Sequence, residues 1–594
     1  MWDDVHSSTN FNWNTFWDVA VKTTSEGWFA EMRIPFSSLR FHNRDGRVTM
    51  GLSAWRGIAR KNEIIIFPSI PPNWGFFSIT KGSQLQPVAI DGVQSRRPLY
   101  VTPYVIGGTG FTNAVNSDRT GYNQTTQAVH DAGGDLKYGI TNNLTLDLSY
   151  NTDFAQVEAD DQQVNLTRFS LFFPEKRQFF QERASVFAFN TGGDDQLFYS
   201  RRIGLSGGHP VPLYGGARLV GRFGDWDVGM IDMQTASEDG LPSENFGVLR
   251  VRRPVLNAGS NIGAILTTRR GGTSNSVYGI DGLFHLRSED YLTLNVAQSF
   301  TEGDANAMDA GDRGLMRANW ERRGQDGLRY NFDASQVGPH FNPAVGYIVR
   351  KDYTRFGNSI SYGWRPGSKS RLLRHKLSFE GSTYLRNSDH STETSTFGPE
   401  WEFEMKTGTI LRFSALSEFE DLREPFELAS DVVVPIGGHR FQNASVSYDP
   451  STTSLLRTGA SVEGGQFYDG WRIAGKISPT WNASQNLEFG GAYQVNRITF
   501  PNRHQSLVAQ IGRVRARVMM STRLSGAAFV QYNSASDAVS ANVRLRYTQR
   551  EGNDLYIVFN EGLNTDRGAF TPYKPLTDTR TLLVKYSRTF DLGF

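Results

Sequence analysis

The sequence contains no cysteine. A disulfide scaffold, a Cys-ligated metal site and thiol redox chemistry are therefore excluded. Long hydrophobic runs are missing too, since the runs present are short ones such as residues 64–67, whereas a membrane-spanning helix needs about 20 apolar residues. The sequence also has no glycine-rich phosphate loop, no His-Glu-x-x-His zinc motif and no nucleophile elbow. These absences remove the enzyme classes that a short motif would reveal.

An excess of charge of either sign is also absent. Lysine and arginine total 62 against 60 aspartate and glutamate, for a formal net charge of +2. No overall field therefore favours nucleic acid, and we expect none as a partner. Residues 1–10 have neither the basic nor the apolar region of a secretory signal peptide. We expect the export signal of an exported protein to lie outside this sequence.

What the sequence does have is aromatic residues, glycine and a regular alternation of polarity. Aromatic residues make up 12% of the chain and glycine contributes 60 residues, while the mean hydropathy is -0.43. In residues 540–547, Ala541, Val543, Leu545 and Tyr547 alternate with serine, asparagine and arginine. Because side chains alternate across a strand, one face of this stretch is apolar and the other is polar.

The same period recurs along the chain, in residues 144–150, 278–287 and 377–382. Short connections such as 224–225 and longer polar ones such as 302–313 separate these stretches, as in outer-membrane barrels. The pattern predicts an all-β protein with a large transmembrane antiparallel β-barrel over residues 96–594. At about 20 residues per strand and connection, this length accommodates roughly 20 to 26 strands.

The last stretch of the chain is amphipathic and ends on an aromatic residue. Leu582, Val584 and Tyr586 share a face that continues to Phe594, with Arg588 as the single charge on it. Such an end resembles the signal that barrel-insertion machinery reads in Gram-negative bacteria, and the alternative is a globular strand that ends in phenylalanine. We expect Arg588 near the membrane interface, where a charge costs about 0–1 kcal/mol instead of ~2–4 kcal/mol at the midplane.

The first 95 residues show a different pattern of expected strands. Residues 17–21 and 28–34 flank a Thr-Ser-Glu-Gly turn and predict a β-hairpin, and further strands are expected at 48–55 and 63–67. Prolines 68, 71 and 72 mark the exit from this region. We interpret residues 1–95 as part of a β-sandwich.

Several runs resemble a family of outer-membrane proteins in which a family 9-like carbohydrate-binding domain precedes a large barrel domain of uncharacterised function. They are NTDFAQVEAD at 151–160, QVNLTRF at 163–169, FFPEKRQFF at 172–180, YSRRIG at 199–204, GARLVGR at 216–222 and FNPAVGY at 341–347. The resemblance implies a location in the outer membrane of a Gram-negative bacterium. It also implies that residues 27–36 are closing strands of the carbohydrate-binding domain, whose earlier half would lie upstream of Met1.

Four carboxylates are concentrated at Asp153, Glu158, Asp160 and Asp161. One interpretation is a polar network in the lumen, because barrel lumens are polar; its candidate partners are Arg168, Arg177, Arg183, Arg201 and Arg202. A second is a calcium site that includes Asp153, Glu158 and Asp160, since calcium takes several oxygen ligands. A third is glycoside hydrolysis, because Glu158 and Asp160 on one strand would lie roughly 6.5–7 Å apart.

The run at 172–180 does not fit a plain strand. Pro174 cannot donate to a ladder, and aromatic pairs flank three charges. We interpret it as part of an inward-folded segment near residues 160–200 that narrows the lumen; the alternative is a loop clamped by aromatics at the rim. The residues assigned to this constriction are Phe173, Glu175, Lys176, Arg177 and Phe180.

Trp28, Trp55 and Trp74 are the candidate ligand-binding residues of the first region, since tryptophans can stack on sugar rings. The alternative is that they anchor a core with their N–H groups satisfied.

Two functions remain. The first is an outer-membrane channel or transporter for glycan-derived or other polymer fragments captured by the N-terminal module, and it requires no cofactor beyond the candidate calcium. The second is a carbohydrate-binding protein or glycosidase anchored by the barrel. We favour the first, which is not an enzyme, and expect membrane lipid, barrel-insertion machinery and carbohydrate as partners.

Overall fold

The structure is a computed structural model that describes residues 15–39, 41, 43–44, 46–58, 61, 63–70, 79, 82–93, 97–152, 159–189, 191–206, 209–237, 240–257, 259–303, 309–429, 431–568 and 571–593. Strands dominate these residues. Their only α-helix is α1 (Gln178–Gln181), and the 3-10 turns are η1 (Phe36–Ser38), η4 (Gly82–Gln84), η5 (Ala184–Val186), η6 (Ser200–Arg202) and η7 (Pro501–Arg503). In these ranges no helix is both long and apolar enough to span a membrane.

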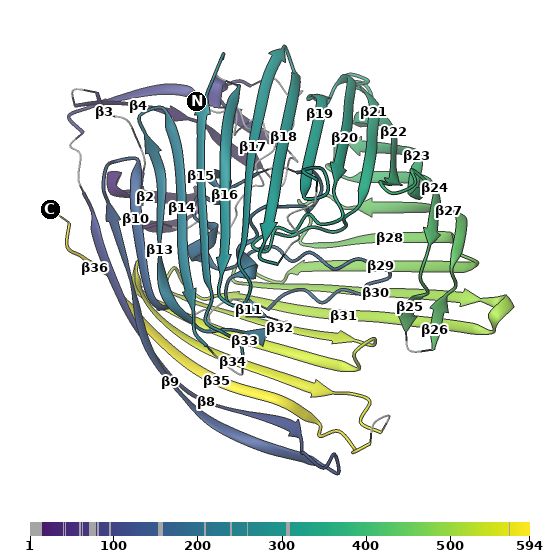
Figure 1. Ribbon diagram of the computed structural model, residues 1–594. Helices are drawn as coiled ribbons and strands as arrows, with labels where there is room; N and C mark the ends of the chain where they lie inside the picture. The colour runs from purple at the N-terminus through teal and green to yellow at the C-terminus, as the bar shows by residue number, and fades with distance from the viewer. Residues whose placement is uncertain are drawn as a thin grey trace.

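A closed antiparallel barrel of 24 strands forms most of the molecule (Figure 1). In ring order the strands are β8 (Leu99–Val115), β9 (Tyr122–Gly139), β10 (Leu144–Thr152), β13 (Leu213–Phe223), β14 (Trp226–Thr235), β15 (Asn245–Pro254), β16 (Asn261–Arg270), β17 (Asn275–Arg287), β18 (Asp290–Thr301), β19 (Gly314–Arg322), β20 (Gly327–Val337), β21 (Tyr353–Trp364), β22 (Leu372–Arg386), β23 (Thr392–Met405), β24 (Ile410–Leu422), β27 (Gly437–Asp449), β28 (Leu456–Phe467), β29 (Gly470–Asn482), β30 (Leu487–Phe500), β31 (Gln505–Met519), β32 (Leu524–Asn533), β33 (Ala538–Arg550), β34 (Asn553–Asn564) and β35 (Thr577–Arg588) with its continuation β36 (Phe590–Asp591). Both β35 and β36 pair with β8, and this pairing closes the ring.

The barrel strands place mainly apolar side chains outward, whereas the inward side chains are mostly polar or small except under the inward segment, where β13–β21 carry apolar ones. On β33, Val543, Leu545 and Tyr547 are exposed on the outer face, whereas Asn542 is buried inside. On β35, Leu582 and the residues two and four positions later are exposed in the same way. The alternation predicted from the sequence is therefore confirmed, and the outer face presents the apolar surface that hydrocarbon accepts.

The connections differ between the two ends of the barrel. At one end they are short, for example 224–225, 288–289 and 551–552, and we call it the turn end. At the other, the loop end, lie 153–212, 302–313, 338–352, 423–436 and 565–576. The 423–436 loop carries a small hairpin of β25 (Phe426–Ala429) and β26 (Val432–Val434). In outer-membrane barrels, short turns face the periplasm and long loops face the exterior.

Residues 15–93 form a module of three small sheets: β1 (Asp18–Thr24) with β2 (Gly27–Arg33); β3 (Asn43–Arg44), β4 (Arg47–Leu52) and β7 (Gln86–Asp91); and β5 (Ala54–Ile58) with β6 (Glu63–Phe67). The predicted hairpin and the strand at 63–67 are confirmed. The strand predicted at 48–55 is instead divided, because β4 pairs with β7 and β5 pairs with β6. No pairing joins the three sheets within the described part of this region.

The module sits against the turn end of the barrel. The rings of Phe16 and Tyr100 lie 4.5 Å apart between centroids. A cavity of about 500 Å³ is lined both by Phe41 of the module and by Thr141 and Asn142 of the turn between β9 and β10. The module is therefore at the end that carries the short turns.

Arg588 lies at the end of β35. It pairs in register with Asn553, the first residue of β34, beside the turn at 551–552. Its guanidinium lies 4.8 Å from the ring centroid of Phe590. This position is at the rim of the barrel, on the side of the short turns. Phe594 lies outside the described residues.

Candidate functional site

The connection between β10 and β13 folds into the barrel. Figure 1 shows this part of the chain inside the ring of strands. It leaves and rejoins the wall at the loop end, and two stretches of it are named here: the bridge, residues 159–170, and the anchor, residues 171–206. The anchor packs on one wall of the barrel, whereas the bridge contacts two other parts of the wall.

An apolar core fixes the anchor to the inner face of β13–β21. Phe180, Phe187, Phe189, Leu197 and Ile203 are all buried in it. They pack with inward residues of the wall, including Ile231, Met233, Val248, Ile265 and Val277. Glycines on the wall make room for them: a Cβ on Gly229 would lie 2.7 Å from the ring of Phe187. Each large apolar side chain buried in this way contributes about 1.5–3 kcal/mol.

The constriction residues pack inside the anchor. The guanidinium of Arg177 donates to both carboxylate oxygens of Glu175, at 2.9 and 2.7 Å, and to the carbonyls of Ser200 and Ile203. It also lies 4.4 Å from the ring centroid of Phe180. Burial would raise the pKa of Glu175, but the hydrogen bonds from Arg177 and Ser200 outweigh it, so this pKa lies below its usual value. Glu175 is therefore ionised, and its ion pair with Arg177 lies inside the anchor.

The anchor reaches down to the turn end. Arg218 of β13, buried on the wall, donates to Asp147 of β10 at 3.1 and 2.7 Å and to the carbonyls of Phe179 and Glu182. Arg183 turns the chain with a φ of 54° and donates to the carbonyl of Asn143 at 3.1 Å. The anchor therefore spans the depth of the barrel.

A second loop supports the anchor from the loop end. Gln196 pairs with Tyr347 of the 338–352 connection, and the buried Asp195 accepts from the backbone N–H of Val349 at 2.8 Å. Burial raises the pKa of Asp195 to about 6. Nothing in the sequence marks Asp195, which follows another aspartate in a glycine-containing turn, and sequence reasoning missed it.

The bridge contacts β31–β33 through a set of polar groups. Asp161 is ion-paired with Arg513 at 3.2 Å and with Arg515 at 3.4 Å. The amide of Gln531 accepts from the backbone N–H of Gln162 at 2.8 Å and donates to the carbonyl of Asp160 at 2.9 Å. The contact thus uses both the carboxylate and the backbone of the bridge.

The other end of the bridge contacts an acidic part of the wall. Arg168 is ion-paired with Glu420 of β24 at 2.7 Å and with Glu393 of β23 at 2.5 Å. Leu166 packs against the apolar cluster that the β25–β26 hairpin forms over the wall. A cavity of about 290 Å³ lies beside Phe169, lined by glutamates of β24 and β28. The bridge is therefore opposite in charge to each wall that it contacts.

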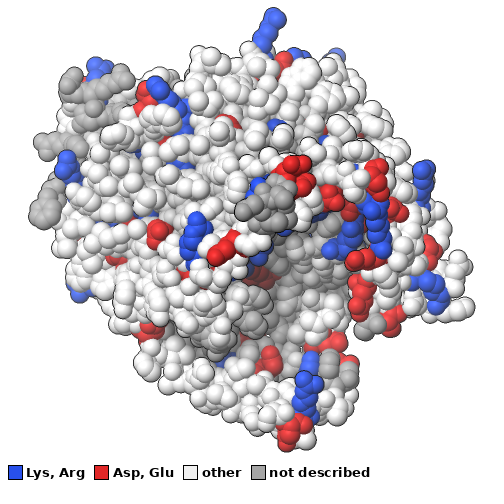
Figure 2. All heavy atoms as spheres, in the orientation of Figure 1, with Lys and Arg blue, Asp and Glu red and all other residues white. Residues whose placement is uncertain are grey.

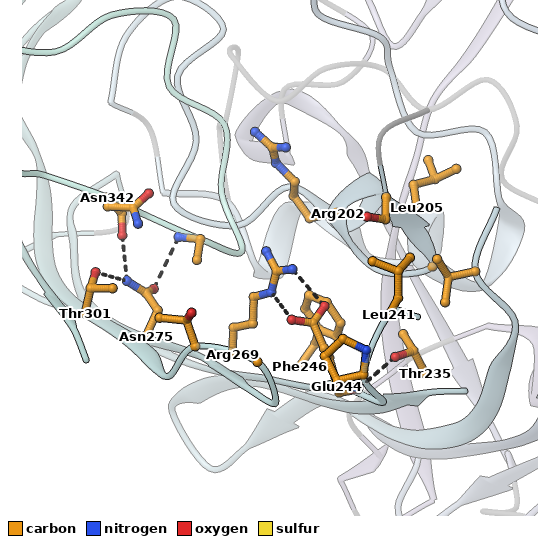
Figure 3. Close-up of a pocket in the computed structure, with 17 residues that line it drawn as sticks. Arg202, Leu205, Thr235, Leu241, Glu244, Phe246, Arg269, Asn275, Thr301 and Asn342 are labelled. Atoms are coloured by element: carbon orange, nitrogen blue, oxygen red, sulfur yellow. Dashed lines mark hydrogen bonds and ion pairs between the residues drawn. The ribbon is translucent and has the colours of Figure 1, made fainter. Parts of the chain in front are cut away.

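Acidic and basic side chains gather around a hollow in the face of the molecule shown in Figure 2. A further cavity, of about 410 Å³, lies where the anchor leaves the lumen (Figure 3). Here Arg269 of β16 is paired with Glu244 at 2.9 and 2.7 Å, and Asn275 links Thr301 to the carbonyl of Asn342. These contacts join the 236–244 and 338–352 loops to the wall beside the end of the anchor.

Of the predicted carboxylate cluster, the structure describes Asp160 and Asp161, which have different cationic partners. Asp153, Glu158 and Trp74 lie outside the described residues. Of the residues assigned to the calcium site and to glycoside hydrolysis, only Asp160 is therefore described. Its carboxylate is bound by Arg201 at 3.1 Å and lies 3.5 Å from the ammonium of Lys176. In the described part of the chain, no group of three or more His, Asp or Glu side chains has a metal-binding arrangement.

The other sequence-predicted residues lie as follows. Arg202 donates to the carbonyl of Gly346 at 3.0 Å, and Lys176 donates to that of Ala159 at 2.7 Å. Trp28 is 71% exposed and Trp55 is 49% exposed, so neither side chain is buried by the described residues. Sequence reasoning missed Arg513 and Arg515; the available signal was the alternate arginines at 513, 515 and 517.

The comparisons with known proteins concern the barrel. A family model described as a domain of unknown function (DUF5916) matches residues 99–211, which include β8–β10 and the whole bridge and anchor. This agrees with the resemblance to a barrel domain of uncharacterised function over that stretch, and the match does not include the N-terminal module. No curated protein matches the chain.

Solved structures with a similar course of the chain are large barrels. The copper transporter OprC is 8% identical, with 85% of this chain and 83% of that one covered and a TM-score of 0.37. The ferric enterobactin receptor PfeA of Pseudomonas aeruginosa is 9% identical over 83% and 81%, with a TM-score of 0.38. The siderophore receptor PirA of Acinetobacter baumannii is 8% identical over 62% and 85%, with a TM-score of 0.36. The barrel itself is defined by the pairing of its strands.

Proposed function

We propose that the protein is a gated transporter in the outer membrane of a Gram-negative bacterium, in which the bridge closes the lumen. The observation that carries this proposal is the difference between the two parts of the inward segment. The anchor is held by a buried apolar core, whereas the bridge relies mainly on ion pairs and hydrogen bonds with opposite walls. Polar contacts in a wet lumen exchange with water at little net cost. The bridge can therefore leave while the anchor stays.

Planar-bilayer conductance tests this function. We expect low conductance from the intact protein and a several-fold increase when residues 159–170 are replaced by a glycine-serine linker of equal length. The matched control replaces residues 565–576, an equally long connection at the same end of the barrel. Equal conductance of the intact protein and the bridge variant, with both correctly inserted, would contradict the proposal.

We further propose glycan-derived fragments as the solutes. The exposed indoles of Trp28 and Trp55 support this, because aromatic faces stack on sugar rings, and the module lies at the end where a solute entering the periplasm would emerge. A panel of oligosaccharides should quench tryptophan fluorescence of the intact protein, and Trp28→Phe should reduce that signal. If no oligosaccharide changes the fluorescence, the solute is of another class.

The alternative function is a carbohydrate-binding or glycoside-hydrolysing site anchored by the barrel. Such a site needs free carboxylates that converge on the rim. Asp160 instead lies between Arg201 and Lys176, and these ion pairs tie its carboxylate to the anchor. Transport is thus the function that these contacts support best.

A further inference from the structure

Strand β31 presents a row of arginines to the lumen. Arg513, Arg515 and Arg517 occupy alternate positions, so their side chains leave the same face at intervals of roughly 7 Å. The guanidinium of Arg515 lies 4.3 Å from the ring centroid of Phe529 on the neighbouring strand, which fixes its orientation. Arg517 is paired with Glu488 at 3.3 Å and does not contact the bridge. The first two arginines of the row therefore form one local site.

The amide of Gln531 completes this site from β32. Gln531 is 2% exposed, so its amide is built into the wall. It makes one donated and one accepted hydrogen bond with the backbone of the bridge. Two guanidinium groups and one buried amide thus converge on a single carboxylate, that of Asp161, and on the peptide groups beside it.

We propose that Arg513, Arg515 and Gln531 form a binding site for the carboxylate of an anionic solute, and that Asp161 occupies this site while the lumen is closed. This inference rests on the proposed gating function and names the class of solute that releases the gate. A solute carboxylate that takes the place of Asp161 removes the ion pairs that hold the bridge to β31. Binding of the solute and opening of the lumen then share one step.

The exposed fractions of the three charged side chains support the exchange of Asp161 for a solute carboxylate at this site. The side chain of Asp161 is 48% exposed, whereas those of Arg513 and Arg515 are 19% and 29% exposed. The cations therefore belong to the wall, and the carboxylate is the partner that water and solutes reach. Guanidinium groups bind carboxylates through paired N–H donors whether the carboxylate belongs to the chain or to a solute.

Binding of sodium glucuronate to the full chain in detergent micelles, measured by isothermal titration calorimetry, tests the site directly. Sodium chloride at equal ionic strength and neutral glucose are the reference solutes. We expect glucuronate to bind and glucose not to bind. Asp161→Asn should tighten glucuronate binding about tenfold, because it removes the internal competitor. The double variant Arg513→Gln and Arg515→Gln should abolish it, while Arg517→Gln, the matched control on the same strand, should leave it unchanged.

The absence of cysteine allows a second readout, because a thiol introduced at Leu166→Cys is unique in the chain. Glucuronate should increase the rate at which this thiol is modified, and sodium chloride at equal ionic strength should increase it less. Unchanged binding in the double arginine variant, or weaker binding in Asp161→Asn, would overturn the proposal. Glucuronate binding without any conductance in bilayers would contradict the transport function and leave the anion site standing.

Discussion

The charged side chain of Arg218 is buried. Its side chain is 1% exposed and its partner Asp147 is 7% exposed. Removing one member of such a pair leaves an uncompensated buried charge, at a cost of about 3–5 kcal/mol. We expect Arg218→Met to lower the free energy of unfolding by about 3 kcal/mol, since Lys137, 3.7 Å from Asp147, remains as a weaker partner.

Urea unfolding in detergent micelles measures this change. The double variant Arg218→Met with Asp147→Asn should recover most of the loss, because no buried charge is left unpaired. A double variant no more stable than the single one would mean that packing, and not charge, accounts for the effect.

Asp195 makes the stability of the anchor depend on pH. Its pKa in the folded protein is about 6, above the ordinary 3.8, because the carboxyl is buried. Below about pH 4 the carboxyl is protonated in both the folded and the unfolded chain, so it does not lower the free energy of unfolding. As the pH rises to about 6 and beyond, ionisation is disfavoured in the fold, and the protein loses up to about 3 kcal/mol.

We therefore expect Asp195→Asn to stabilise the protein above pH 7 and to have little effect at pH 4. The asparagine oxygen can still accept from the N–H of Val349. Unfolding midpoints across this pH range measure the difference, and Asp194→Asn, on the exposed neighbour, controls for the loss of a negative charge. A gain that is the same at pH 4 and pH 7 would contradict the stated origin.

At the scale of elements, the anchor and the wall fit each other through glycine. A Cβ on Gly229 of β14 would lie 2.7 Å from the ring of Phe187 and 3.0 Å from Val186. Gly229→Val should push the anchor off β14 and destabilise the protein by about 1–3 kcal/mol. The matched control is Gly490→Val on β30, where a Cβ meets nothing within 4 Å.

Limited proteolysis of the anchor distinguishes the two glycine variants. Cleavage within residues 176–183 should become faster in Gly229→Val and stay slow in Gly490→Val. Equal protection of both would mean that the anchor can shift without leaving the wall.

The sequence predicted the elements well, because the period of a strand is local. It predicted the outward faces of β33 and β35 and a strand at 63–67, and the 24 observed strands fall within the predicted range. It could not predict the partners across the lumen. Asp161 and Arg513 are 352 positions apart, and only the order of strands in the ring brings them together. For the same reason the cluster at 153–161 did not reveal which arginines would face it.

At the scale of the whole molecule, the two parts of the inward segment should respond oppositely to salt. The ion pairs of Asp161 are partly exposed and are screened, since the Debye length falls to about 3 Å at 1 M salt. The apolar core of the anchor is not screened. We expect a thiol at Leu166→Cys to react faster as sodium chloride increases, and one at Phe187→Cys to stay protected. Equal salt dependence at both positions would show that bridge and anchor move as one body.

Closure of the barrel depends on the pairing of β35 with β8. Asn113 of β8 donates to the carbonyl of Thr577 at 2.7 Å, and Thr102 contacts Thr589 at 2.9 Å, so partners more than 460 positions apart close the ring. The first barrel strand to be synthesised therefore waits for the last one before its edge is covered. During that interval both edges display unpaired backbone groups, which invite pairing with other chains. Until β35 pairs with β8, both edges of the unfinished sheet therefore need protection from pairing with other chains.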